Sequence, residues 1–331
     1  MLLSRGVQKY HSPSLFFEFL LILFIGFRFQ VGGDWYTYLD GLEIFNKTSL
    51  QEVLFLKYEI GFNFLSWITQ ELGANIYGIN LVCATIFVSG LTKLCREQPY
   101  PWLAVIVAVP YLIIVVAMGY TRQATAIGFL MYGFGYITQG RVIPYLVIVF
   151  FAASFHKTSI VFLALPLFKP GAGYLRFLLG AILLAIMSTV SVVIEQAETF
   201  YLHYVIENME SDGGLVRVLM NLPPVIILLY NWKKWGEKYQ DRWLWAYMSI
   251  LAVACIPLVS LASTVVDRMA LYLIPLQLVA WSRLPVLIGW RIRHTFLAVI
   301  SYYASVEFIW LVYGNFSSSW IPYDNLLFPS F

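Results

Sequence analysis

Charged residues are scarce in this sequence, and their scarcity excludes most classes of soluble protein. Only 12% of the 331 residues are Asp, Glu, Lys or Arg, whereas 60% are hydrophobic and 18% are aromatic. A water-soluble fold needs more charged and polar side chains to cover its surface. The composition therefore predicts an integral membrane protein.

Signatures of cofactor chemistry are also missing. The three cysteines have no CxxC spacing, which predicts packing roles rather than a disulfide framework. The four histidines are scattered without an HExxH spacing, and there is no Walker A sequence, GxSxG elbow or Rossmann fingerprint. We therefore expect no metal, no cofactor and no nucleic-acid partner.

Long apolar runs predict an all-α, polytopic transmembrane helical bundle. A helix needs about 20 apolar residues to cross a bilayer core, and many runs approach that length. We expect about eleven segments in a single integral membrane domain over residues 1–331. They are 14–31, 75–92, 101–119, 121–138, 142–155, 157–168, 174–194, 215–231, 243–262, 266–282 and 295–313. The short fifth and sixth segments predict a hairpin of tilted or broken helices around His156.

The distribution of cations predicts the orientation of the chain. With the N-terminus inside, fourteen of the 21 Lys and Arg residues fall on the cytoplasmic side and the other seven fall outside. Such an excess on the cytoplasmic side follows the positive-inside rule and predicts an N-in, C-out topology. The first run follows Arg5 and Lys9 without a closing A-x-A site, so we interpret it as an uncleaved signal anchor.

Two long connections on the expected outer side, 32–74 and 195–214, hold most of the acidic residues. Loops of that length are often functional. In the first loop, Ser49 and Glu52 have the spacing of a capping box, and apolar residues follow them. This pattern predicts a helix that lies on the membrane surface.

Five outer cations stand at the ends of apolar segments rather than in mid-loop. Each could reach lipid headgroups or pair with an acidic neighbour such as Asp267. As a set they favour a convergent anion site, because guanidinium groups match phosphate geometry in a bidentate way. The candidate pyrophosphate-binding residues are Arg122, Arg217 and Arg268, assisted by Arg28 or Lys157.

The stretch VGGDWYTY, residues 31–38, follows the first segment. Its two glycines permit a sharp turn that places Asp34 among aromatic rings at the outer mouth of the bundle. Rings pack on the apolar faces of sugars, and a carboxylate can deprotonate a sugar hydroxyl. The alternative is that Asp34 caps the next helix and the rings form an interfacial belt. Candidate sugar-binding residues are Trp35, Tyr38 and Tyr120.

Two further residues are candidates for the catalytic base. Glu59 lies in KYEIGF, residues 57–62, and has a stronger structural alternative than Asp34. A lone histidine in an apolar setting is more often a packing residue than a catalyst. His156, however, heads a segment on the expected face of the arginines and precedes Lys157. The residues leave the choice among Asp34, Glu59 and His156 open.

The order of these motifs resembles the EpsG family of multispanning proteins from bacterial exopolysaccharide gene clusters, which are similar to Wzy-type polymerases. The motifs that carry the resemblance are GGDWYTY, YEIGF, GYTRQATA (119–126), FHKTSIVF (155–162) and DRMALYL (267–273). The resemblance implies a multi-pass protein of the bacterial cytoplasmic membrane. It also suggests a fold related to the class C glycosyltransferases, which often place an essential acid in the first outer loop, where Asp34 stands here.

The implied activity is polymerisation on the periplasmic side. A growing glycan on polyprenyl pyrophosphate would be transferred to another lipid-linked repeat unit, with membrane lipids and export or chain-length proteins as further partners. The cations would neutralise the departing pyrophosphate, and one of the three candidate bases would take the acceptor's proton. A flippase for the same lipid, a membrane acyltransferase and a structural export component are the alternatives.

Overall fold

The computed structural model describes residues 10–45, 48–54, 59–171, 173, 180, 213–260 and 263–328. Within these residues the chain is helical except for loops and two short strands. It forms two compact units: unit 1 comprises Gln8–Ile160 and Trp290–Phe331, and unit 2 comprises Val161–Gly289. Apart from residue 180, the predicted segment 174–194 lies outside the described residues, as does the loop 195–214 except for its last two residues.

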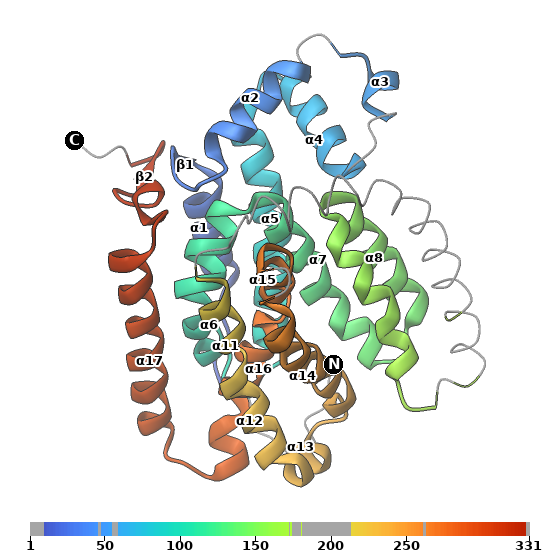
Figure 1. Ribbon diagram of the computed structural model, residues 1–331, viewed down its shortest axis with the longest axis vertical. Helices are drawn as coiled ribbons and strands as arrows, with labels where there is room; N and C mark the ends of the chain where they lie inside the picture. Colours follow the sequence, from blue (N-terminus) through green and yellow to red (C-terminus); the bar gives the residue numbers. More distant parts are fainter. Residues whose placement is uncertain are drawn as a thin grey trace. The chain divides into compact units, whose positions relative to one another are not determined.

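Unit 1 is a bundle in which α5 packs against α1, α6 and α7, and α7 packs against α8 (Figure 1). Its helices are α1 (Leu15–Gly26), α2 (Trp35–Phe45), α3 (Leu50–Leu54), α4 (Ile60–Glu71), α5 (Asn75–Arg96), α6 (Pro101–Ala108), the π-helix η1 (Val109–Ala117), α7 (Thr121–Thr138), α8 (Val142–Phe155), α17 (Ile292–Tyr313) and the 3₁₀ turn η4 (Ser317–Ser319). The 3₁₀ helix η2 (Lys157–Phe168) begins in this unit. The bounds of α7, α8 and η2 confirm the predicted segments 121–138, 142–155 and 157–168.

Helices α5 and α7 cross at a pair of glycines. A Cβ atom on Gly90 would lie 2.0 Å from the carbonyl oxygen of Gly128, and one on Gly128 would lie 2.5 Å from the Cα of Phe87. Only glycine permits such backbone contact, and small residues of this kind are typical where membrane helices approach closely. The crossing brings the start of α7 beside the start of α5.

Residues 32–74, predicted to form the first outer loop, fold into α2, α3 and α4, which lie together at one end of the unit, at the top of Figure 1. The predicted capping box is confirmed: Ser49 N donates to Glu52 Oε2 at 2.7 Å, and Glu52 N donates to Ser49 Oγ at 3.4 Å. Apolar side chains of all three helices join a buried cluster with α5 and α8. The loop is therefore a packed cap, of which the sequence predicted only the α3 part.

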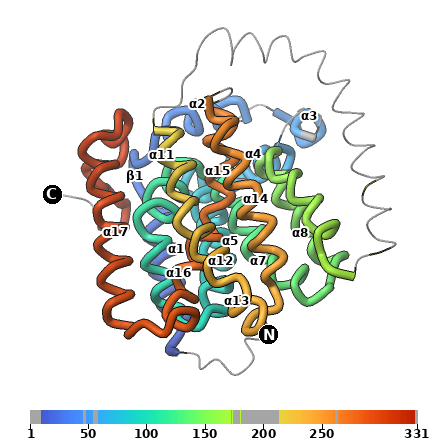
Figure 2. The backbone as a smooth tube through the Cα atoms, turned by 60° about the horizontal axis from the view of Figure 1, so that its bottom comes forward, coloured from blue at the N-terminus to red at the C-terminus, as the bar shows by residue number. Residues whose placement is uncertain are grey.

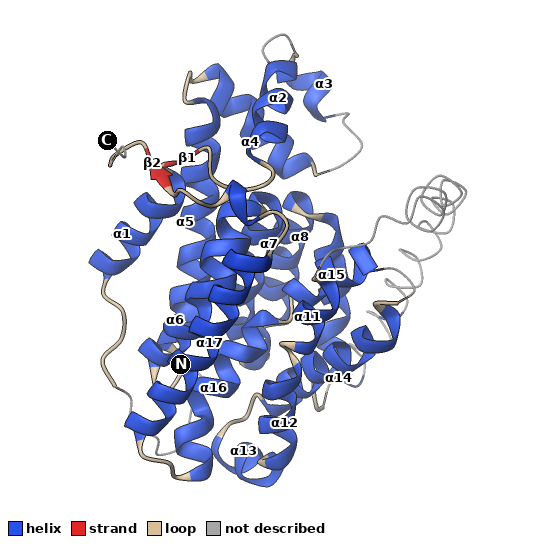
Figure 3. Cartoon of the chain, turned by 60° about the vertical axis from the view of Figure 1, so that its left-hand side comes forward, coloured by secondary structure: helices blue, strands red, loops and turns tan. Residues whose placement is uncertain are grey.

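The C-terminal segment closes back on the first helix. Strand β1 (Arg28–Phe29) pairs antiparallel with β2 (Asp324–Asn325), as Figure 3 shows in red. Nearby, Gly32 N donates to Ser319 O at 2.8 Å, and Trp320 Nε1 donates to Ile114 O of η1 at 2.9 Å. These contacts fix the turn that precedes α2.

Unit 2 packs α11 against α15, and α12 against α14 and α16 (Figure 2). Its helices are α11 (Gly214–Leu219), α12 (Leu222–Tyr230), α13 (Trp232–Lys238), α14 (Arg242–Leu258), α15 (Ser263–Leu271) and α16 (Ile274–Ile288). A buried polar network joins three of them, because Gln277 donates to Asn221 at 2.8 Å and Asn221 donates to Ala270 O at 3.3 Å.

The apolar helices are those of a membrane protein. Among the described residues, α5 and α17, each 22 residues long, are long and apolar enough to span a bilayer. Two bent pairs would add one span each: α11–α12 with α13, bent by 77°, and α15 with α16, bent by 44°. Shorter apolar helices of 10–17 residues account for most other predicted segments.

Candidate active site

The candidate site in unit 1 is built around Arg122, the second residue of α7. Its Nη1 forms a short ion pair with Oε2 of Glu59, which precedes α4. The arginine side chain is 39% exposed, whereas the glutamate side chain is 10% exposed. The guanidinium therefore remains accessible to an incoming anion while its carboxylate partner is almost covered.

Aromatic rings join this pair to Asp34. The guanidinium carbon of Arg122 lies 5.5 Å from the ring centre of Tyr38 and 5.7 Å from that of Phe62, within the range of cation–π attraction. The Tyr38 hydroxyl donates to Oδ2 of Asp34 at 3.4 Å. Tyr38 thus links Asp34 to the Arg122–Glu59 pair in one connected cluster.

Burial changes the acidity of two groups in the outer-loop cap. Burial, followed by the charge of Asp34, raises the pKa of Tyr38 to about 12, although Arg122 lowers it. Burial also raises the pKa of Glu59, against the opposing effects of Arg122 and Lys157. Tyr38 therefore stays protonated and donates, while Glu59 accepts a proton more readily than an ordinary glutamate.

The backbone at Glu59, the partner of Arg122, has an unusual conformation. Glu59 has φ 54° and ψ 47°, a left-handed conformation that is uncommon and costly for residues other than glycine. It occupies the N-cap position of α4 without capping that helix. Gly61 holds the helix close to α8, because a Cβ there would lie 2.4 Å from Ser154 Oγ. Gly61 thus permits the close contact between α4 and α8 two residues after the strained Glu59.

The predicted break at His156 is confirmed. Helix α8 ends at Phe155, His156 is extended with φ −150°, and η2 begins at Lys157. His156 is half-buried, and its ring Nδ1 lies 2.7 Å from Thr158 Oγ1. The backbone carbonyl of His156 accepts a hydrogen bond of 2.9 Å from Ser159 Oγ. Lys157 acts on Glu59 through its charge and its backbone N–H. The break therefore supplies the cluster with a second cation.

Comparison with known protein families identifies the family to which this chain belongs. The sequence profile of the EpsG family matches residues 13–325, nearly the whole chain. The chain belongs to the EpsG family. Comparisons with curated proteins and with solved structures give no match. Family membership implies a role in exopolysaccharide biosynthesis at a membrane.

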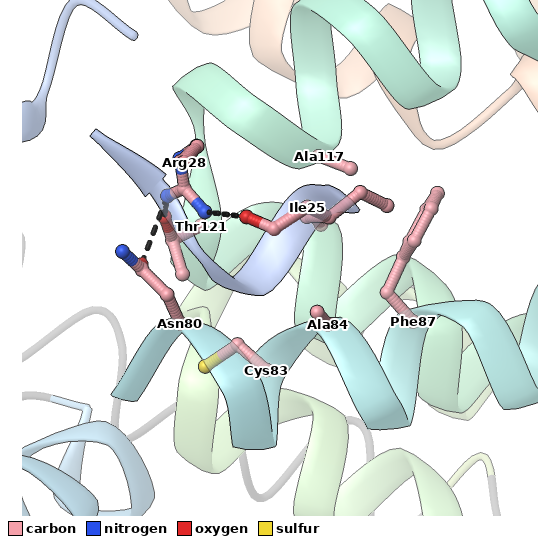
Figure 4. A pocket seen from close by; sticks show the side chains of 9 residues that line it. Ile25, Arg28, Asn80, Cys83, Ala84, Phe87, Ala117 and Thr121 are labelled. Carbon is pink, nitrogen blue, oxygen red and sulfur yellow. Dashed lines mark hydrogen bonds between the residues drawn. The ribbon is translucent and has the colours of Figure 1, made fainter. Parts of the chain in front are cut away.

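In this EpsG-family protein Arg28 is held by the protein itself (Figure 4). It is 2% exposed, and its guanidinium donates to Ile25 O at 2.8 Å, Val31 O at 3.3 Å, Asn80 Oδ1 at 2.9 Å and Thr121 Oγ1 at 2.7 Å. These bonds tie the end of α1 to α5 and to the start of α7. Arg28 supports the position of Arg122 in this structure, and its assistance to a pyrophosphate stays a prediction.

The other predicted cations belong to unit 2. Arg217 Nε lies 2.5 Å from Oδ1 of Asp267, and both side chains are nearly covered, at 11% and 6% exposed. Arg268 is half-buried at the end of α15. This pairing is the alternative that the sequence raised for Arg217, and the convergence of these residues with Arg122 stays a prediction.

The predicted sugar-binding aromatics have different environments. Trp35 is 4% exposed and belongs to the buried cluster of the outer-loop cap, so it packs against protein. Tyr38 is buried between Asp34 and Arg122, and Tyr120 is half-buried at the N-cap of α7. By contrast, Tyr36 is 59% exposed and is the ring most open to a ligand in this stretch.

Sequence reasoning named both Glu59 and Arg122 but missed their pairing. They are 63 residues apart, and only the fold brings the two motifs together. The opposite charges of YEIGF and GYTRQATA were the available signal. Among the described residues no group of three or more His, Cys, Asp and Glu side chains is arranged to hold a metal ion.

Proposed function

We propose that this EpsG-family protein is a polysaccharide polymerase. It joins oligosaccharide repeat units carried on polyprenyl pyrophosphate at the outer face of the bacterial cytoplasmic membrane. The supporting observation is the contact of Arg122 with Glu59 and Tyr38, which joins an accessible guanidinium to two carboxylates. A reaction that expels pyrophosphate and removes a hydroxyl proton needs those two functions side by side.

The proposed reaction is a single displacement. A hydroxyl oxygen of the acceptor glycan forms a bond with the anomeric carbon of the donor, and the bond from that carbon to the pyrophosphate oxygen breaks. The leaving pyrophosphate takes the electron pair, and its charge is stabilised by Arg122 and Lys157. The hydroxyl proton passes to Asp34, Glu59 or His156.

The wider arrangement forms part of the same proposal. About eleven segments cross the membrane in an N-in, C-out, multi-pass topology related to the class C glycosyltransferases. Arg217 and Arg268 are further candidates for binding the pyrophosphate. Proteins of polysaccharide export or chain-length control are further partners. The contact of Arg122 with the first outer loop supports a shared outer face.

The decisive experiment compares lipid-linked glycans in a strain that lacks the protein and in the same strain carrying wild-type or Arg122→Ala protein. We expect single repeat units to accumulate on the outer face without the protein, polymer to return with wild type, and Arg122→Ala to leave most units single. An Asp40→Asn variant, which alters an exposed acid of α2, controls for changed charge in the cap.

Other outcomes would assign another function. Single units confined to the cytoplasmic leaflet would indicate a flippase, and polymer of normal length without acyl groups would indicate an acyltransferase. Normal polymer from every cluster variant, with loss only when the protein is deleted, would indicate a structural component of the export complex. Each of these results would overturn the polymerase assignment.

A further inference from the structure

Unit 1 contains an open cavity of about 350 Å³ beside the GGDW turn. Its lining residues come from the turn before α2 and from the segment that follows α17. These two segments meet where β1 and β2 pair, as the backbone in Figure 3 shows. The residues that line it are Phe29, Gln30, Gly32, Gly33, Tyr36, Ser318, Ser319, Ile321, Pro322 and Asp324. Residues from both ends of the chain therefore form one recess.

The walls of this recess are fixed by backbone contacts. Phe29 pairs with Asp324 in the β1–β2 register, and the Gly32–Ser319 hydrogen bond joins the turn to η4. Gly32 has φ +105°, and a Cβ there would lie 2.2 Å from Met118 O, so this position requires glycine. The cavity is therefore a preformed feature of the fold, as most small-ligand sites are.

The chemistry of the lining suits a neutral polyhydroxylated ligand. Asp324 supplies a carboxylate, Ser318 and Ser319 supply hydroxyls, and Gln30 supplies an amide. Neither lysine nor arginine is among the lining residues, all of which the structure describes. The site is thus unsuited to phosphate and differs from the cluster around Arg122.

An exposed ring completes the site. Tyr36 on α2 is 59% exposed and Phe29 on β1 is 36% exposed, and both line the cavity. Aromatic rings pack on the apolar C–H faces of sugars, while carboxylates and amides bind the hydroxyls. A volume of about 350 Å³ is at the small end of ligand sites and admits a short piece of glycan.

We propose that this cavity binds a sugar of the acceptor glycan. The assignment rests on the proposed polymerase function. Gly33 lines the cavity and Asp34 is the next residue, so a sugar bound here would present its hydroxyl next to the Asp34–Tyr38–Arg122 cluster. The cavity thus binds the sugar of the acceptor, and the cluster around Arg122 binds the pyrophosphate of the donor.

Cysteine protection tests occupancy directly. All three native cysteines are buried, so a Ser318→Cys variant of the full chain in proteoliposomes offers a single accessible thiol. The probe is the repeat-unit oligosaccharide released by partial hydrolysis of the host strain's own polymer. We expect it to slow labelling by a membrane-impermeant maleimide about tenfold at a concentration ten times its dissociation constant.

The matched control places a thiol nearby but outside the cavity. Phe316 is 67% exposed and does not line the recess, so the labelling of Phe316→Cys should not change with the oligosaccharide. Maltotriose at the same concentration should protect neither thiol. Equal protection of both thiols, or none of Ser318→Cys, would overturn the proposal.

A second measurement uses side-chain removal. Tyr36→Ala and Asp324→Asn should each weaken binding of the same oligosaccharide about tenfold, because each removes a principal contact with the sugar. Ile44→Ala, which alters an exposed residue of the same helix outside the cavity, should bind as wild type does. Saturation-transfer NMR on the purified protein in nanodiscs gives these affinities without any transfer reaction.

The two proposals fail in different ways. Protection of Ser318→Cys with no polymerase activity would leave a glycan site in a protein of another function. Normal polymerisation together with unprotected Ser318→Cys and unchanged binding by Tyr36→Ala would reject the cavity and keep the polymerase.

Discussion

Arg283 donates two parallel hydrogen bonds of 2.7 Å to Asp241, one from each terminal nitrogen to each carboxylate oxygen. Trp245 adds a third bond of 2.8 Å to the same carboxylate, and Arg283 lies 3.9 Å from the ring centre of Tyr239. This pair is closed, with side chains 3% and 5% exposed, whereas the Arg122 side chain of the Arg122–Glu59 pair is 39% exposed. The first arrangement suits a structural role and the second suits ligand binding.

The closed pair predicts a stability effect. Arg283→Ala should lower the free energy of unfolding by about 3–5 kcal/mol, because it leaves Asp241 buried without its partner. The double variant Asp241→Leu, Arg283→Met should recover much of the loss, since two apolar side chains leave no unpaired charge. Thermal unfolding in detergent measures both, and Arg293→Ala, an exposed arginine of α17, is the control. A loss no larger than that of the control would contradict the structural role.

The glycine crossing predicts a second stability effect. Gly90→Ala places a Cβ 2.0 Å from Gly128 O, so α5 and α7 must separate, at a cost of about 1–3 kcal/mol. Gly41→Ala has nothing within 4 Å of its new Cβ and should be neutral or stabilising by up to about 1 kcal/mol. The same unfolding assay compares the two, and equal midpoints would show that the helices do not need this contact.

Arg122 predicts a graded effect on polymer synthesis. Arg122→Ala should lower the rate about 10²–10³-fold, as expected for removing a group that stabilises the leaving charge. Arg122→Lys should lose less, because it keeps the charge but not the bidentate fork. Rates with purified lipid-linked repeat units measure this order. If the lysine variant is as impaired as the alanine variant at equal protein levels, charge is not the contribution of Arg122.

Substitution of the three candidate bases separates their roles. If Asp34 is the base, Asp34→Asn should abolish polymer while the folded protein still binds donor, and His156→Ala should chiefly weaken binding. If His156 is the base, that ranking should reverse, and activity should fall as the pH drops through its pKa, near 6.5 when unperturbed. Full yield from both variants would remove both from the chemistry and leave His156 in a packing role.

The raised pKa of Glu59 predicts how activity depends on pH if this residue is the base. Burial raises the pKa of its carboxyl above the ordinary value of 4.5, and Arg122 counteracts this effect. A base must be deprotonated, so if Glu59 is the base, activity is present above the raised pKa and lost as the pH falls through it. Replacing Arg122 with Gln removes the opposing charge and should move this acid limb to higher pH. A pH profile that keeps the same acid limb in Glu59→Gln would exclude Glu59 as the base.

The sequence predicted those parts of the fold that depend on local patterns. The ends of α7 and α8, the break at His156 and the Ser49–Glu52 capping box follow from apolar runs and cap spacing. Helix α2 was anticipated only in the alternative that Asp34 caps a following helix, and α4 was missed. Both have mixed composition, and their apolar faces are covered only by contacts with other elements.

For the site, residue type was predictable and partnership was not. The sequence singled out both Arg28 and Arg122 as cations at segment ends, with Arg122 as a principal pyrophosphate ligand and Arg28 in an assisting role. The structure separates them, since Arg28 is 2% exposed among backbone and side-chain acceptors and Arg122 is accessible. The cavity was missed as well, because it combines a turn at residues 30–33 with residues 318–324, and neither segment has a motif that indicates the other.

The strand pair at the end of the chain also bears on how the protein is made. Tyr323 donates to the carbonyl of Phe24 across 299 residues of sequence, and contacts of such high sequence separation form late. During synthesis, α1 and the cap helices emerge long before the residues that complete the recess beside them. A nascent chain can therefore insert its earlier helices while this recess is still unfinished, and the recess is completed only after residues 318–324 have left the ribosome.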